Sequence, residues 1–120
     1  MARQPELGTG LEWLVDARGC DPSSLRDAGA LGRVFALAVE ELGLHPLDAP
    51  RFHTFPAPGG VTGMLMLSES HLTCHSFPET GFVAFNLYCC RERPDWPWAE
   101  RLRELLGARE VQVRRLERSA

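Results

Sequence analysis

The chain has 120 residues, enough for one domain with a single hydrophobic core and too few for two. Its formal net charge of −3 excludes a general attraction to nucleic acid, because the basic residues are spread along the chain until an arginine-rich end. All 13 basic residues are arginine, which excludes a pyridoxal phosphate held by a lysine Schiff base, a P-loop lysine and a lysine nucleophile.

The sequence predicts neither a membrane protein nor a secreted one. No apolar stretch reaches the ~20 residues that span a bilayer, and residues 1–10 lack the charged-then-apolar pattern of a signal peptide. We therefore expect a cytoplasmic protein without membrane partners. In that compartment the four cysteines are expected to be thiols, and the neighbours Cys89 and Cys90 would point to opposite faces of a strand.

The chain begins with a flexible segment, a strand and a helix. Residues 1–9 are polar and contain proline and glycine, so we expect them to be frayed. Residues 10–19 alternate apolar and polar side chains over most of their length, which predicts a strand. Residues 20–24 (CDPSS) are typical of a turn. Asp27 is then suited to cap a helix that ends before Gly43. One face of this helix is apolar and belongs to the core: Leu31, Val34, Phe35, Ala38 and Leu42.

Prolines and glycines divide the middle of the chain into strands. Because of prolines at positions 46 and 50, we expect the next strand to begin only near Arg51. A loop rich in proline and glycine follows at residues 56–60. Residues 61–67 are nearly all apolar, which is typical of a buried strand. A turn that ends at Gly81 then leads into a strand at residues 82–89.

A second helix and a last strand complete the chain. Asp95 can cap the helix, with Pro97 in its first turn and Gly107 at its end. Residues 110–116 alternate enough to form a strand. The apolar face of the helix is formed by Trp98, Leu102, Leu105 and Leu106.

This order of elements predicts the fold class. Reading β-α-β-β and then β-β-α-β, the chain has two βαββ-like halves, although no sequence repeat supports the symmetry. We expect residues 1–120 to form one α+β domain, a two-layer sandwich in which two helices pack on one face of an antiparallel sheet.

The reactive side chains are concentrated between residues 67 and 90. Ser70 beside His71 is weak support for a hydrolase, because neighbours on a strand face opposite ways and no G-x-S-x-G elbow is present. A zinc site is also disfavoured, since His71 and Cys74 have opposite parity and no paired C-x-x-C spacing occurs. Taken singly, each residue is more simply explained as part of a strand or of the core. Their joint pattern favours catalysis without a metal.

The joint pattern carries a resemblance to a known family. Residues 68–79 (SESHLTCHSFPE), residues 52–55 (FHTF), residues 60–63 (GVTG) and Cys90 resemble the short prokaryotic S-adenosylmethionine decarboxylases. The similarity runs in order over about residues 10–118. It implies a pyruvoyl-dependent enzyme that is made by self-cleavage of its own chain.

In that family's chemistry the chain is cut between Glu69 and Ser70. The Ser70 hydroxyl attacks the carbonyl carbon of Glu69, and the acyl group shifts from nitrogen to oxygen. Removal of a proton from the Cα of Ser70 eliminates the ester, and hydrolysis of the dehydroalanine leaves a pyruvoyl group and ammonia. The substrate amine forms a Schiff base with this ketone, an electron sink that a chain without lysine cannot obtain from pyridoxal phosphate.

The resemblance also implies roles for individual residues. His75 stands at the position of the histidine that transfers protons during processing, and Thr62 replaces a serine that assists the same step. Cys90 has the catalytic spacing from the cleavage site and would return a proton to Cα after carbon dioxide leaves. Phe55 would stack on adenine, and Glu79 would accept hydrogen bonds from the ribose hydroxyls.

Several positions depart from the family pattern and leave the substrate open. Asp16, in the first strand, replaces a glutamate and is a further candidate for substrate binding. Asn86 replaces an aspartate, Phe77 replaces a tryptophan, and the loop at residues 56–60 is one residue longer. Each of these positions is expected near the pocket, where a shortened carboxylate and an altered loop could reshape the binding site.

Three functions are therefore compatible with the sequence. The first is an S-adenosylmethionine decarboxylase that supplies the aminopropyl donor for spermidine synthesis. The second is the same chemistry on a basic amino acid, ornithine or arginine. The third is an uncleaved homologue that acts as a regulatory partner subunit. The resemblance implies a homodimer with active sites near the interface.

Overall fold

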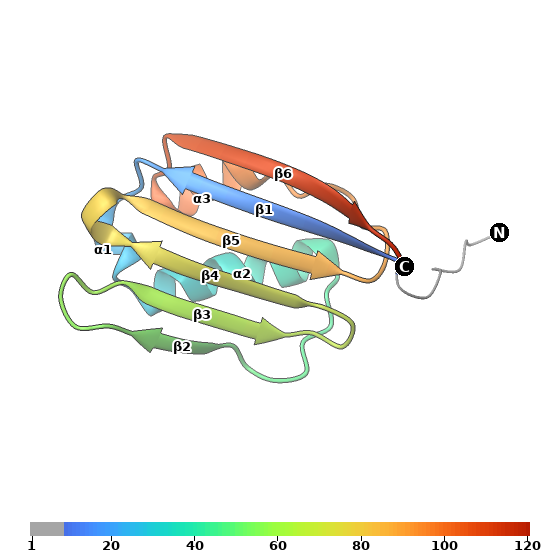
Figure 1. Ribbon diagram of the computed structural model, residues 1–120. Helices are drawn as coiled ribbons and strands as arrows, with labels where there is room; N and C mark the ends of the chain where they lie inside the picture. Colours follow the sequence, from blue (N-terminus) through green and yellow to red (C-terminus); the bar gives the residue numbers. More distant parts are fainter. Residues whose placement is uncertain (1–8) are drawn as a thin grey trace.

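Within residues 9–120, which a computed structural model describes, six strands form one antiparallel sheet of order β2-β3-β4-β5-β1-β6 (Figure 1). The flexibility expected for residues 1–9 thus concerns a segment that, apart from Thr9, lies outside the described residues. The strands are β1 (Gly10–Arg18), β2 (Arg51–Thr54), β3 (Val61–Met66), β4 (His71–Phe77), β5 (Phe82–Cys89) and β6 (Glu110–Arg118). The helices are α1 (Pro22–Leu25), α2 (Ala28–Leu42), η1 (Pro78–Thr80) and α3 (Trp98–Leu106).

The predicted α+β two-layer sandwich is confirmed. Helices α2 and α3 lie on one face of the sheet, and the opposite face carries no helix (Figure 1). Strand β1, the first in the chain, lies between β5 and β6 of the second half, so the two halves share one continuous sheet. No helix among residues 9–120 combines the length and the apolar character needed to cross a bilayer.

Local capping explains where the first helices begin and end. The Asp27 carboxylate accepts a hydrogen bond from the Gly29 amide at 2.8 Å, and Gly43 ends α2 with a left-handed φ of 64°. Both boundaries of this helix are therefore as predicted. The segment 20–24, expected to be a turn, instead contains the start of α1, because the Asp21 side chain caps this short helix.

The start of α3 differs from the prediction. The helix begins at Trp98, and its N-cap residue, Pro97, offers no capping side chain. Asp95 lies three residues before the helix, too far to accept hydrogen bonds from its first amides. Its carboxylate instead accepts a hydrogen bond from Trp13 Nε1 at 3.1 Å, which joins the loop after β5 to strand β1.

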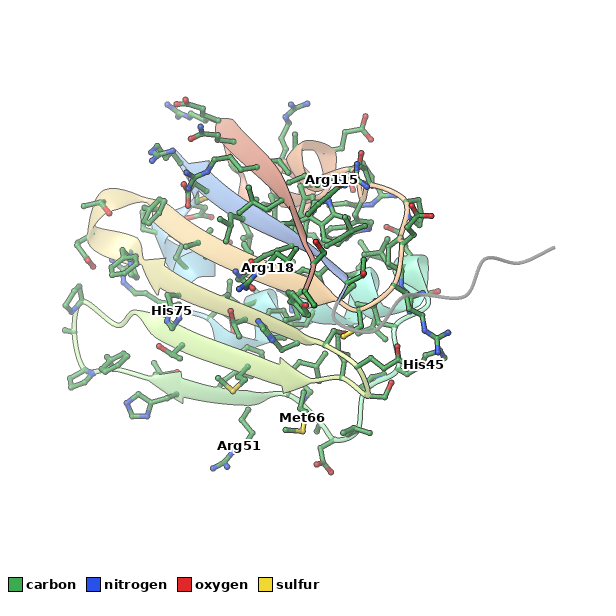
Figure 2. The ribbon with its side chains drawn as sticks, turned by 45° about the vertical axis from the view of Figure 1, so that its right-hand side comes forward. His45, Arg51, Met66, His75, Arg115 and Arg118 are labelled. Carbon is green, nitrogen blue, oxygen red and sulfur yellow. The ribbon has the colours of Figure 1, made fainter. Side chains whose placement is uncertain are left out.

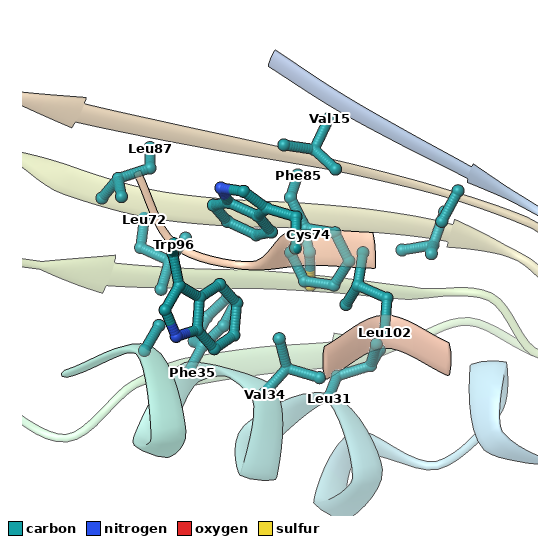
Figure 3. Close-up of a cluster of buried hydrophobic side chains, with 14 of the residues drawn as sticks. Val15, Leu31, Val34, Phe35, Leu72, Cys74, Phe85, Leu87, Trp96 and Leu102 are labelled. Atoms are coloured by element: carbon teal, nitrogen blue, oxygen red, sulfur yellow. The ribbon is translucent and has the colours of Figure 1, made fainter. Parts of the chain in front are cut away.

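The core lies between α2, α3 and the covered face of the sheet (Figure 3). The rings of Phe35 on α2 and Phe85 on β5 have centroids 6.5 Å apart, and the Phe85 ring also contacts Trp98 of α3 at 5.8 Å. Outside the core, Glu41 of α2 accepts hydrogen bonds from Arg101 and Trp96, which hold the pKa of its carboxyl below the ordinary value. These contacts join both helices to each other and to the sheet.

The uncovered side of the sheet, here called the open face, carries an unusual share of apolar side chains. Met66, the last residue of β3, is 62% exposed although it belongs to a strand with neighbours on both sides. Register places alternate residues of each strand on this face. Its large exposed apolar residues are Met64, Met66, Phe77 and Leu116.

One buried hydroxyl ties three elements together. Ser76 Oγ donates a hydrogen bond to the Leu25 carbonyl at 2.7 Å and accepts one from the Val61 amide at 2.9 Å. Strand β4 is thereby fixed to β3 and to the end of α1. Because both partners lie in a buried region, neither can turn to water if the hydroxyl is lost.

We therefore expect Ser76→Ala to lower the free energy of unfolding by about 1–3 kcal/mol, the cost of leaving buried polar groups unpaired. The measurement is urea unfolding followed by tryptophan fluorescence, on chains whose covalent state has been checked by denaturing gel. Ser119→Ala, at an exposed position, is the matched control and should change stability by less than about 0.5 kcal/mol. Equal stability of the two variants would contradict the assignment.

Candidate active site

The Glu69–Ser70 bond lies in the tight turn that joins β3 to β4. The Leu67 amide donates a hydrogen bond to the Ser70 carbonyl at 3.0 Å, which closes a two-residue loop of Ser68 and Glu69. The Ser68 amide donates to the His45 carbonyl at 2.9 Å, so the segment after α2 supports the turn from one side. The predicted cleavage site is thus held at one end of the sheet.

Cys90 contacts the carbonyl group of the predicted scissile bond. This residue directly follows β5, the neighbour of β4, and its thiol donates a hydrogen bond to the Glu69 carbonyl oxygen at 2.6 Å. A donor at this oxygen stabilises the negative charge that develops when a nucleophile attacks the carbonyl carbon. Ser70 supplies the nitrogen of this bond, and its side chain forms a hydrogen bond with the Cys89 thiol. Three predicted residues, Glu69, Ser70 and Cys90, therefore meet.

The other cysteines are buried. Cys89 lies on the helix side of the sheet while Cys90 is half-exposed, so the two neighbours have the opposite orientations that were predicted. Burial raises the pKa of Cys20 to about 11 and that of Cys74 to about 12. Burial also raises the pKa of Cys89, although Arg93 opposes the shift. All four cysteines are free thiols, and Cys90 alone is accessible.

A second group of predicted residues lies at the other end of the same two strands. Thr62 and His75 pair directly across β3 and β4, with 3.2 Å between Thr62 Oγ1 and His75 Nδ1. They line a cavity of about 360 Å³ together with Phe55 and Glu79, which come from the loop after β2 and from η1. This volume falls within the range of small-molecule sites. Four residues expected to bind substrate or assist processing thus share one cavity.

The remaining candidates divide between this cavity and the sheet beside it. Phe77 and the loop at residues 56–60 line the cavity. Asp16 lies level with His75 on the open face but two strands away, about 10 Å across the sheet, and does not line the cavity. Its carboxylate is 3.8 Å from a guanidinium nitrogen of Arg114.

The two groups of site residues do not meet within one chain. Ser70 and His75 are five residues apart along an extended segment, a separation of about 17 Å. Figure 2 shows His75 and His45 at opposite ends of the sheet. The His45 carbonyl accepts the hydrogen bond from Ser68 in the turn between β3 and β4. Proton transfer requires contact at about 3 Å, so His75 does not act on Ser70 of its own chain. The cavity beside Ser70 is only about 20 Å³, room for one water molecule.

The structure also reveals contacts that the sequence did not predict. Arg91 forms a bidentate ion pair with the side chain of Glu69, both N–O distances being 2.8 Å. On the open face, Asn86 donates to a Glu12 carboxylate oxygen at 2.8 Å, and its Oδ1 lies 3.1 Å from His71 Nε2. Pairs separated by 22 and 74 residues become neighbours only through strand pairing, so no local pattern indicates them.

The arrangement of these side chains does not favour a metal centre. His71 is exposed on the open face, whereas Cys74 is fully buried on the helix side, in agreement with their opposite parity. Among residues 9–120, no three His, Cys, Asp or Glu side chains converge in a way that could hold a metal ion.

Comparison with known proteins identifies the family of this chain. Residues 11–119 match the family described as S-adenosylmethionine decarboxylase. The chain belongs to this family. It is 35% identical over 86 residues to the S-adenosylmethionine decarboxylase proenzyme of Pyrococcus furiosus, a match that covers 72% of this chain and 60% of that protein.

A further relative and a solved structure carry related names. Proenzyme 2 of Halalkalibacterium halodurans is 39% identical over 82 residues, 68% of this chain and 63% of that protein. The chain thus covers only about 60% of the length of the curated relatives it matches. The crystal structure of the adenosylmethionine decarboxylase from Aquifex aeolicus has the same fold, with a TM-score of 0.77 over 94% of this chain and 92% of that one, at 22% identity.

The difference in thiol burial predicts selective labelling. At pH 8, iodoacetamide should modify Cys90 first, since burial keeps Cys20 and Cys74 protonated and inaccessible. Mass spectrometry should find one label per native chain and all four cysteines labelled in guanidinium chloride. Cys90→Ser is the control and should leave the native chain unlabelled on the same timescale. Labelling of Cys89 as fast as Cys90 would contradict the assignment.

Proposed function

We propose that the protein is a pyruvoyl-dependent S-adenosylmethionine decarboxylase that makes its cofactor by cutting its own Glu69–Ser70 bond. The observation that carries this proposal is the Cys90 thiol, which donates to the carbonyl oxygen of the Glu69–Ser70 bond. Family membership supports it, since the matched relatives are named S-adenosylmethionine decarboxylase proenzymes.

The cleavage begins with attack of Ser70 Oγ on the carbonyl carbon of Glu69. The hydrogen bond from Cys90 stabilises the charge on the carbonyl oxygen, and the C–N bond breaks to leave an ester and a free amine. A base then removes the Cα proton of Ser70. The Cβ–Oγ bond breaks, and residue 69 leaves with its backbone carboxylate as the new C-terminus of the first fragment. The remaining enamine tautomerises to an imine, and water releases ammonia to leave a ketone at position 70.

The residues around position 70 suit such a group. The chain has no lysine that could hold a pyridoxal cofactor, and an accessible thiol lies beside the cleavage site. The pyruvoyl group supplies a carbonyl that accepts the electron pair released as the substrate's carboxylate leaves. Cys90, whose thiol lies at this bond, would hold the proton that returns to the substrate's Cα.

The larger cavity would bind the nucleoside part of the substrate. Phe55 is 51% exposed at its edge and offers a ring face to adenine, and the Glu79 carboxylate can accept hydrogen bonds from ribose hydroxyls. Asp16 lies on the same face of the sheet, but its carboxylate is paired with Arg114, so its charge does not distinguish a sulfonium substrate from a basic amino acid. Neither a basic amino acid as substrate nor a purely regulatory role is favoured by the family match.

The separation of the two groups of residues supports a homodimer. The open face exposes Met64, Met66, Phe77 and Leu116, and apolar faces of this kind pack against another surface. We propose that two copies pack open face to open face about a two-fold axis that lies between the sheets and perpendicular to the strands. That operation reverses the strand direction, so the Ser70 end of one copy faces the cavity of the other.

In this dimer the active site is composite. His75 and Thr62 of the partner subunit would approach position 70, where His75 can remove the Cα proton during cleavage. Phe55 and Glu79 of the partner subunit would bring bound substrate to the ketone. We place this enzyme in the cytoplasm, where its product would serve as the aminopropyl donor for spermidine synthesis.

Self-cleavage predicts two fragments, residues 1–69 and 70–120, in the purified protein. Ser70→Ala should remain one chain of 13.4 kDa, because the attacking hydroxyl is lost. Ser68→Ala removes the other hydroxyl of the same turn and is the matched control, which should cleave normally. Intact mass spectrometry reports both the cut and the mass of the new terminus. An active protein with an unbroken chain would refute the proposal.

Substrate choice is tested on the same samples by release of labelled carbon dioxide. Cleaved protein should act on S-adenosylmethionine, and Ser70→Ala should show no activity with it. Ornithine and arginine are the competing substrates, and a clear preference for either would contradict the assignment while leaving the pyruvoyl chemistry intact. A chain that stays uncleaved and is inactive on all three would favour the regulatory alternative.

A composite site predicts complementation between two inactive variants. His75→Ala alone should cleave about 10²–10⁴-fold more slowly, as expected when a general base is lost. Co-expressed with a differently tagged Ser70→Ala chain, it should be cut, because the partner still supplies His75. Only the His75→Ala chain should appear as fragments on the gel. If that chain stays intact in the mixed dimer, His75 does not act across the interface.

A further inference from the structure

Two consecutive residues, Cys90 and Arg91, bind the backbone carbonyl and the side-chain carboxylate of Glu69. The Cys90 thiol donates to its backbone carbonyl at 2.6 Å, and the guanidinium of Arg91 donates to both oxygens of its side-chain carboxylate at 2.8 Å. The fork is formed by Nε and Nη2 of the arginine, which matches the planar geometry of a carboxylate. One side of the predicted scissile bond is therefore fixed at two points by the residues that follow β5.

The two contacts differ in strength. A thiol is a weak hydrogen-bond donor, so the bond from Cys90 orients the carbonyl only if something else restricts the turn. A bidentate pair with arginine is charge-assisted and fixes both distance and direction. Its partners are half-exposed, with side-chain exposures of 56% for Arg91 and 43% for Glu69, so the pair adds little to global stability. Its effect is expected on the local geometry of the turn.

We propose that Arg91 is a positioning residue for self-cleavage. By holding the carboxylate of Glu69, it keeps the carbonyl of the same residue on the Cys90 thiol and in line for attack by Ser70. The inference rests on the proposed self-cleavage and adds a residue to it. Arg91 acts on the bond only through Glu69, and it makes no contact with substrate in this assignment.

The alternative is an ordinary surface ion pair with no influence on the reaction. Exposed pairs of this kind are common and often contribute nothing measurable to stability. The two cases differ in what they predict for the rate of cleavage. If the pair positions the bond, cleavage becomes slower when the pair is broken or screened by salt. If the pair has no such role, the cleavage rate stays the same.

The experiment follows cleavage over time by denaturing gel after cell-free synthesis of labelled precursor. Arg91→Ala should cleave about 3- to 10-fold more slowly than the unaltered chain, and Arg91→Lys should fall between them, because an ammonium keeps the charge but not the fork. Arg103→Ala, exposed on α3, is the matched control and should cleave at the unaltered rate.

Charge reversal separates positioning from damage to the fold. The double variant Glu69→Arg with Arg91→Glu should recover part of the rate that each single change loses. The unaltered chain should also cleave more slowly as sodium chloride rises to ~1 M, where the Debye length is about 3 Å, and Arg91→Ala should not. This salt series remains informative if a variant folds poorly.

Each outcome bears on one proposal. If the unaltered chain never cleaves, the proposed function fails and the role of Arg91 fails with it. If the unaltered chain cleaves and Arg91→Ala matches it at low salt, the positioning role is refuted and the proposed function stands. If both single changes slow cleavage but charge reversal recovers nothing, the pair is not the cause and the positioning role is refuted.

Discussion

The pairing of β3 with β4 is the constraint on which the rest of the site depends. Both strands are extended, and the turn between them carries the Glu69–Ser70 bond at one end of the sheet. The same two strands carry Thr62 and His75 at the other end, and an extended backbone cannot fold back to join them. A site that needs both groups is therefore incomplete in one chain, and a second copy in reversed orientation is the simplest way to complete it.

The residues that directly follow strand β5 supply the groups that contact Glu69. Its pairing with β4 returns the chain to the Ser70 end, where the strand stops and Cys90 and Arg91 follow in succession. One residue then reaches the carbonyl of Glu69 and the next reaches its carboxylate. The chemistry of the turn thus depends on where β5 ends, since a shift of one residue would exchange the roles of the buried and accessible thiols.

The two faces of the sheet differ in what they contact: one packs against helices, and the other is uncovered. The covered face forms a core with α2 and α3, and buried thiols there are unreactive because burial raises their pKa. The open face keeps polar and apolar side chains together, among them Asp16, His75 and Met66, in a way that suits an interface with a binding site inside it. The core and the cavity residues His75 and Thr62 therefore lie on opposite faces of the same sheet.

The sequence by itself determined the element order, the caps of α2 and the short list of reactive residues, because these follow from local periodicity and from residue chemistry at fixed spacing. It did not determine that Asp95 bonds to Trp13 instead of capping α3, that Arg91 holds Glu69, or that Asp16 lies outside the cavity. Those relations join residues far apart in the chain, and only the register of the sheet decides which of them meet. The same register also keeps apart two candidate residues that are close in sequence: Ser70 and His75 are about 17 Å apart in the fold, because the segment between them is a strand.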